Sequence, residues 1–176
     1  MANRQALRDL QARLAERLQA ARGDTRQSAS WLAVQIGSTN YLLPLEQSGE
    51  IFTWPGMLRV PYAKSWFLGV SNLRGSLVGV VDASAYLGQP IERTEQSLSE
   101  VSLLSLNTTL QVNAAIIVDR LLGLRGERDL QIADGQPPEK GAGVFGIRCV
   151  DAAGEVWQVL NLQQLVQQPE FLNIRV

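Results

Sequence analysis

Two apolar segments joined by a tight turn constrain the fold of this chain more than any other feature of its sequence. The turn is the tetrapeptide Asn72-Leu73-Arg74-Gly75. Apolar residues precede and follow it, namely Phe67, Leu68, Val70, Leu77, Val78, Val80 and Val81. Short β-rich runs separated by Asn and Gly are typical of strands joined by a hairpin turn. We therefore expect a hairpin within residues 51–88, with Arg74 at its corner.

Other segments also have the composition of short strands. Leu32, Val34 and Ile36 alternate with other residues, and a turn at residues 37–40 leads into a second strand at 41–45. Further strands are expected at residues 57–60, 101–106, 114–118, 144–150 and 156–160. No Gly-rich phosphate loop or long crossover helix follows any of them, which favours small antiparallel barrels over an α/β sheet. The sequence therefore predicts an all-β fold.

Helices are expected to be few and short. Asp82 is suited to cap a helix that runs through Leu87, with Gly88 in the left-handed position that ends it. Asn161 is suited to cap a second helix over residues 162–166. Because the second half of the chain repeats the plan of the first, we expect two similar lobes. The polar residues 89–100 are interpreted as the connection between them.

Residues 1–28 are expected to form a separate N-terminal helix and linker, with the main domain spanning 29–176. Leucines recur at helical spacing and line one face, at positions Leu7, Leu10, Leu14 and Leu18. Two interpretations stay open for this amphipathic helix. Its leucine stripe docks on the body of the same domain, or its basic face contacts a membrane surface or a partner helix.

Composition excludes several kinds of chemistry. The chain of 176 residues has no histidine and a single cysteine, Cys149, so it cannot form a Ser-His-Asp triad, a Cys-His pair or an intramolecular disulfide. One Cys cannot build a zinc site either, and no cofactor is expected. Sixteen basic and seventeen acidic residues leave a net charge of −1, which gives no general attraction for nucleic acid. No apolar run approaches the roughly 20 residues that cross a bilayer, and a cytoplasmic protein is expected.

Two functions are alternatives to a protein-binding module. An enzyme would have to use carboxylates such as Asp119, Asp129 and Asp134, whose spacing matches no catalytic pattern. A nucleic-acid binder built on small barrels would use the basic residues Arg120, Arg125 and Arg128. Acidic residues interrupt this cluster, and no aromatic residues are interleaved for base stacking.

Several motifs in this order resemble the CheW family of chemotaxis scaffold proteins. They are Tyr41 to Leu45, Glu50-Ile51, Val60-Pro61, Gly69 to Gly75 and Val80-Val81-Asp82, followed more loosely by residues 115–119 and 159–161. The resemblance covers roughly residues 31–166. Within the family the chain is most similar to the PilI-type proteins of twitching-motility pathways. It departs from the family at Ala83 and at Trp54-Pro55-Gly56.

The resemblance implies a fold and a function. The fold is a pair of interlocked five-stranded SH3-like β-barrels. The function is that of a non-catalytic adaptor that binds the regulatory domain of a CheA-type histidine kinase and the cytoplasmic tip of a chemoreceptor. The pathway implied is a chemotaxis-like one that controls type IV pilus twitching motility. Such a protein is cytoplasmic and is recruited to membrane receptor arrays, and it binds no nucleic acid.

The resemblance also places the candidate binding residues around the hairpin. Arg74 matches the signature arginine of the family, and its side chain is expected to reach either Glu50, which matches the acidic position of the family, or backbone carbonyls. It serves either as a structural bridge that fixes the turn or as a direct contact to the receptor. Trp54 and Trp66 lie near Pro55 and Pro61 and are expected to contribute to surface recognition; a large ring in such a loop is either a lid on the core or an interface anchor. The full candidate set is Glu50, Ile51, Trp54, Trp66, Val70, Asn72, Leu73, Arg74 and Gly75. Within it, Ile51, Val70 and Leu73 are more often core than contact residues.

Overall fold

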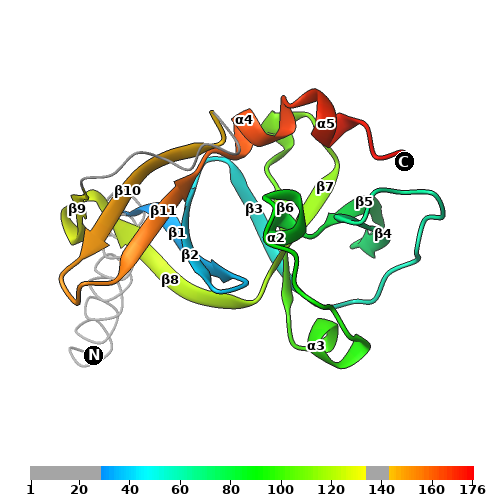
Figure 1. Ribbon diagram of the computed structural model, residues 1–176, viewed down its shortest axis with the longest axis horizontal. Coiled ribbons are helices and arrows are strands. Elements are labelled where there is room, and N and C mark those ends of the chain that lie inside the picture. The colour runs from blue at the N-terminus through cyan, green and yellow to red at the C-terminus, as the bar shows by residue number, and fades with distance from the viewer. Residues whose placement is uncertain (1–28, 134–142) are drawn as a thin grey trace, which may run out of the picture.

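The computed structural model describes residues 29–133 and 143–176, and its strands form two sheets (Figure 1). Six strands form one sheet, namely β1 (Ala29–Ile36), β2 (Thr39–Pro44), β8 (Arg120–Gly126), β9 (Leu130–Ile132), β10 (Phe145–Asp151) and β11 (Val156–Leu160). Their order is β8-β1-β2-β11-β10-β9. All pairs are antiparallel except β2 with β11.

The other sheet has five strands. They are β3 (Ser48–Thr53), β4 (Phe67–Leu73), β5 (Ser76–Val81), β6 (Ser102–Leu106) and β7 (Ala114–Val118). Their order is β3-β6-β7-β5-β4, with β5 and β7 as the one parallel pair. The expected all-β fold class is confirmed. One sheet exceeds the expected five strands because the three residues of β9 pair with the outer side of β10.

Three apolar clusters explain how the sheets pack. One cluster lies within the six-stranded sheet around Leu42 and Trp157, and another lies within the five-stranded sheet around Leu103 and Ile117. The largest cluster lies between the sheets and takes residues from both of them. Several strands are therefore buried on both faces, as β7 is at all five positions. This explains why Ala114–Val118 is continuously apolar instead of alternating.

The chain crosses between the two sheets twice in the described residues. It leaves the six-stranded sheet after β2 and enters β3 through residues 45–47, and it returns after β7 at Asp119. The two lobes are thus interlocked. The expectation from composition that the two halves of the sequence form one lobe each is wrong, because β1 and β2 complete a sheet made mostly of late strands. Burial of apolar surface, and not the order of the strands along the chain, decides which strands share a sheet.

Short helices close the strand ends. They are α2 (Ala83–Tyr86), α3 (Glu95–Ser99), α4 (Leu162–Val166) and α5 (Pro169–Leu172), with one-turn 3₁₀ segments η1 (Thr108–Leu110) and η2 (Glu127–Asp129). Asp82 accepts hydrogen bonds from the first amides of α2, and Asn161 caps α4 in the same way. Gly88 follows α2 with a φ of +81°. Both expected caps are confirmed.

Two local expectations are corrected. Residues 57–60 form no strand; a single bridge joins Leu58 to Val70. Residues 89–100 do not connect the lobes, because they join α2 to β6 within the five-stranded lobe and contain α3. The N-terminal helix predicted for residues 1–28 lies outside the described residues.

Cys149 is buried in the cluster of the six-stranded sheet, and this burial raises the pKa of its thiol. Within residues 29–133 and 143–176, none of the helices has the length and apolar composition that crossing a bilayer requires.

Candidate functional site

The tip of the β4–β5 hairpin is a two-residue turn. Leu73 pairs with Ser76, so only Arg74 and Gly75 lie between the strands, with φ of +49° and +87°. Two positive φ values are the requirement of a type I′ turn, whose twist matches that of the strands. The side chain of Asn72 accepts a hydrogen bond of 2.7 Å from the amide of Gly75 and so fixes the turn.

Arg74 occupies a position that most residues avoid. A side chain in the left-handed region costs on the order of 1 kcal/mol, and Asn or Gly would fit there with less strain. Its guanidinium lies 2.6 Å from a carboxylate oxygen of Glu50 and 5.5 Å from the ring centroid of Phe52. Of the two partners expected for Arg74, the structure shows Glu50.

Both partners of this ion pair are exposed to solvent. Their side chains are 75% and 60% exposed, so water screens the attraction and the pair contributes about 0–1 kcal/mol to stability. Ser105 of β6 fixes the backbone of Glu50. Its hydroxyl accepts a hydrogen bond from the amide of Glu50 and donates one to the carbonyl of Glu50. The side chain of Arg74 is thus displayed on a stiff support and stays accessible.

The other candidate residues divide between surface and interior. Ile51 is 44% exposed, and Leu77, the cross-strand partner of Asn72, is 61% exposed. Val70 is half-buried and Leu73 is buried. We define the hairpin surface as the exposed group of Glu50, Ile51, Asn72, Arg74 and Leu77, to which the open turn residue Gly75 belongs.

The structure corrects the expected placement of Trp66. This ring is buried in the cluster between the sheets, stacked on Phe171 at 5.7 Å and in edge contact with Tyr86. Residues near the C-terminus supply its cover, which the local sequence around Pro61 does not reveal. Trp54 is half-buried and packs against the inner cluster of the five-stranded sheet, so it acts chiefly as a lid.

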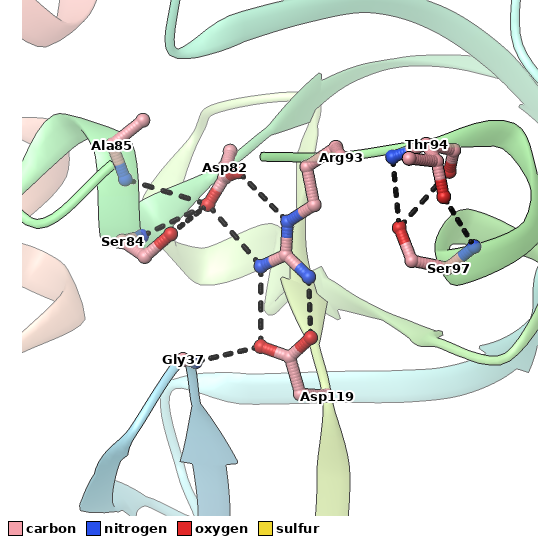
Figure 2. A network of polar contacts seen from close by, with 8 residues as sticks. All are labelled: Gly37, Asp82, Ser84, Ala85, Arg93, Thr94, Ser97 and Asp119. Atoms are coloured by element: carbon pink, nitrogen blue, oxygen red, sulfur yellow. Dashed lines mark hydrogen bonds and ion pairs between the residues drawn. The ribbon is translucent and has the colours of Figure 1, made fainter. Parts of the chain in front are cut away.

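A buried network centred on Arg93 shares no residue with the hairpin surface; Figure 2 shows its members. The guanidinium donates to Asp82 through Nε at 3.0 Å and contacts Asp119 through both terminal nitrogens. Asp82 also caps α2, and Asp119 accepts a 2.6 Å bond from the amide of Gly37. The side chains of Arg93 and Asp82 are 7% and 2% exposed. The network thus joins the β1–β2 turn, the start of α2 and the end of β7.

The contacts of Arg93 with the two carboxylates compensate for the cost of removing its charge from water. Desolvation alone lowers the pKa of Arg93, but hydrogen bonds and charge from Asp119 and Asp82 outweigh it, so the pKa lies above its usual value. In the described residues, every buried side-chain nitrogen or oxygen has a partner. The guanidinium is therefore permanently charged and satisfied on both sides.

Sequence analysis missed Arg93 because it lies in the polar segment interpreted as a connection. The available signal was the repetition of an apolar strand ending in aspartate, at Val80-Val81-Asp82 and Ile117-Val118-Asp119. Two buried strand ends with a carboxylate each require a cation nearby. Only the fold reveals which basic residue supplies it.

Three of the residues considered for other functions have partners within the chain. Asp119 binds Arg93, and the carboxylate of Asp129 accepts from the amide of Gly126. Arg125 lies over the ring of Trp157 at 5.4 Å. Asp134 lies outside the described residues. No group of three potential metal ligands occurs in the part of the chain that the structure describes.

Comparisons with known proteins agree with this architecture. The family model of the CheW-like domain matches residues 30–170. Protein PilI of Pseudomonas aeruginosa is 29% identical over 159 residues, which is 89% of this chain and 85% of that protein. The chemotaxis protein CheW of Rhizobium meliloti is 33% identical over 69 residues, covering 39% of this chain and 44% of its own.

A solved structure shares the fold. The scaffolding protein TtCheW from Thermoanaerobacter tengcongensis superimposes with a TM-score of 0.65 at 14% identity, covering 81% of this chain and 94% of its own. The family match extends from β1 to α5 and includes the hairpin surface and the Arg93 network. The chain belongs to the family of proteins built on a CheW-like domain.

Proposed function

We propose that this protein is a non-catalytic adaptor that couples the cytoplasmic tip of a chemoreceptor to the regulatory domain of a CheA-type histidine kinase. Membership of the CheW-like family supports this role, and the similarity to PilI supports a pathway that controls type IV pilus twitching motility. The adaptor would work in the cytoplasm at membrane receptor arrays. It needs no cofactor for this role.

One observation carries the proposal for the binding surface. Arg74 is held at a positive φ on a rigid turn, with its side chain 75% exposed. A residue kept in a strained backbone conformation with little gain in stability indicates a role for its side chain. The hairpin surface adds exposed apolar area at Ile51 and Leu77 beside this charge. Such a combination fits a partner that presents apolar side chains next to a carboxylate.

Substitution of Arg74 by asparagine separates a binding role from a structural one. Asn-Gly is the preferred sequence of a type I′ turn, so Arg74→Asn keeps or slightly raises stability while it removes the guanidinium. The matched control is Arg128→Asn, which removes an exposed arginine from η2 on the other lobe.

Binding to the purified kinase regulatory domain and to a receptor-tip fragment of the same organism would be measured by calorimetry. We expect Arg74→Asn to weaken at least one of these interactions by about tenfold, equivalent to 1.4 kcal/mol, and the control to change neither. Unchanged binding to both partners would remove Arg74 from the interface. Absence of binding by the unmodified protein to every such kinase and receptor would refute the adaptor role itself.

The pathway is tested in cells. A strain whose own copy carries Arg74→Asn is expected to lose most of its twitching zone while it keeps the normal amount of the protein. A strain with Arg128→Asn is the comparison. Normal twitching together with a defect in swimming would assign the protein to a flagellar array instead.

A further inference from the structure

The Arg93 network lies where strands from both sheets end. β1 ends at Ile36, β5 at Val81 and β7 at Val118, and each of these residues belongs to the cluster between the sheets. The next residue of each strand, Gly37, Asp82 or Asp119, enters the network. The network therefore closes the end of the apolar interface between the two lobes.

Asp119 has a special place among these residues. It is the point at which the chain passes from β7 in the five-stranded sheet to β8 in the six-stranded sheet. Its amide donates to the carbonyl of Gln35 in β1, and its carboxylate accepts from Gly37 and from Arg93. Arg93 thus links this crossover to Asp82, which belongs to the five-stranded lobe (Figure 2).

Apolar packing and a forked ion pair constrain geometry differently. Burial of apolar surface is non-directional and tolerates small rotations of one sheet on the other. A guanidinium that bonds two carboxylates has five donors in a fixed plane, so it tolerates much less. The other crossover has a neutral counterpart, in which the side chain of Gln47 accepts from the amides of Leu162 and Gln163.

We propose that Arg93 is a positioning residue that fixes the orientation of the two lobes by clamping the crossover at Asp119 to the α2 cap at Asp82. The clamp makes the two lobes one stiff body. A change of packing at a partner bound to one lobe then reaches a partner bound to the other, since a flexible joint would absorb it. The clamp rests on geometry alone, whereas its consequence for coupling rests on the proposed function.

The test requires a variant that keeps the fold but loses the clamp. Arg93→Met alone would leave two carboxylates unpaired and destabilise the protein. The triple variant Asp82→Asn, Arg93→Met, Asp119→Asn removes all three charges together, and Asn at position 82 still caps α2. Replacement of a whole buried ionic group by well-packed apolar side chains is often neutral for stability, and each Asn keeps a side-chain oxygen that can accept from the amide of Ser84 or Gly37. Arg93→Lys is the second variant, because it keeps the charge but loses the fork.

Pulsed electron paramagnetic resonance reports the orientation of the lobes. Spin labels at Leu77→Cys in β5 and Val156→Cys in β11 span the two sheets, and both positions are exposed. Labels at Leu124→Cys and Val156→Cys lie within the six-stranded sheet and are the matched control. The thiol of Cys149 is buried, so we expect it to take up no label in the native protein.

We expect the distance distribution between the sheets to become about twofold wider in the triple variant and in Arg93→Lys, with no change for the control pair. A width equal to that of the unmodified protein in either folded variant would overturn the clamp. Equal broadening of both pairs would show general loosening and would overturn it too.

A reconstituted complex tests the consequence. The triple variant is expected to bind the kinase domain and the receptor fragment one at a time within about twofold of the unmodified protein, while receptor-dependent control of the kinase falls about tenfold. Retained coupling in a variant with widened distances would refute this consequence. Failure of the unmodified protein to bind either partner would refute the proposed function and leave the distance measurement valid.

Discussion

Two ion pairs in this protein use the same chemistry in opposite surroundings. Arg74 and Glu50 meet at the hairpin tip with most of their side chains in water, whereas the side chains of Arg93 and Asp82 are almost completely out of it and that of Asp119 is 22% exposed. Water weakens the first pair but leaves its arginine available to a partner. Burial makes the second costly to disrupt and hides it from partners. Arginine thus presents its charge to solvent at the hairpin tip and stabilises the fold in the buried network.

Removal of Arg93 would test this contrast with the largest effect. Arg93→Ala leaves the carboxylates of Asp82 and Asp119 without their cation, and we expect it to lower the free energy of unfolding by about 3–5 kcal/mol. Urea denaturation followed by fluorescence measures the loss. Arg128→Ala, at an exposed position, serves as the control and should stay within about 0.5 kcal/mol. A loss below about 1 kcal/mol for Arg93→Ala would show that water replaces the network.

Substitution of two hairpin leucines would separate residues that stabilise the fold from residues that are exposed for binding. Leu73 is 5% exposed in the inner cluster, and Leu77 is 61% exposed on the hairpin surface. Leu73→Ala is expected to cost about 2–4 kcal/mol because it opens a cavity, and Leu77→Ala less than about 0.5 kcal/mol. Calorimetric titration should rank them in the opposite order, with weaker partner binding for Leu77→Ala. If Leu73→Ala caused the larger loss in both stability and binding, the assignment of Leu77 to a binding surface would be contradicted.

The turn itself gives a smaller effect. Gly75 has a φ of +87°, and an added Cβ would meet no atom within 4 Å, so backbone strain is the only penalty of a side chain there. Gly75→Ala is expected to lower stability by about 1 kcal/mol. Thermal unfolding measures it, with Ser76→Ala as the neighbouring control. A stable Gly75→Ala variant would mean that the turn relaxes, and the display of Arg74 would then lose its stiff support.

The smallest effect is expected from the exposed ion pair. A double-mutant cycle with Glu50→Gln and Arg74→Gln should give a coupling energy below about 1 kcal/mol. Added salt should reduce it further because the Debye length falls from about 10 Å at 0.1 M to about 3 Å at 1 M. Urea denaturation at both salt concentrations provides the energies. A coupling above about 2 kcal/mol would make the hairpin pair structural, like the Arg93 network.

The candidate site was only partly predictable. The hairpin followed from local chemistry, because Asn72 and Gly75 favour a turn whatever surrounds them. The family resemblance gave Glu50 as one of two possible partners of Arg74, the other being backbone carbonyls. The burial of Trp66 was not, because its cover comes from Phe171, more than a hundred residues later in the chain. Arg93 was missed for the same reason, since its partners lie at the ends of two strands that the sequence alone does not bring together.

The sequence by itself determined the class of structure and the local turns. Alternation of apolar residues, Asx caps before α2 and α4, and the tight hairpin all depend on neighbours a few positions away, whose preferences act in any fold. Only the tertiary structure decided which strands share a sheet, where the chain crosses between lobes and which arginine is buried there. These depend on the burial of apolar surface and charge between distant segments, which is settled when the whole chain packs.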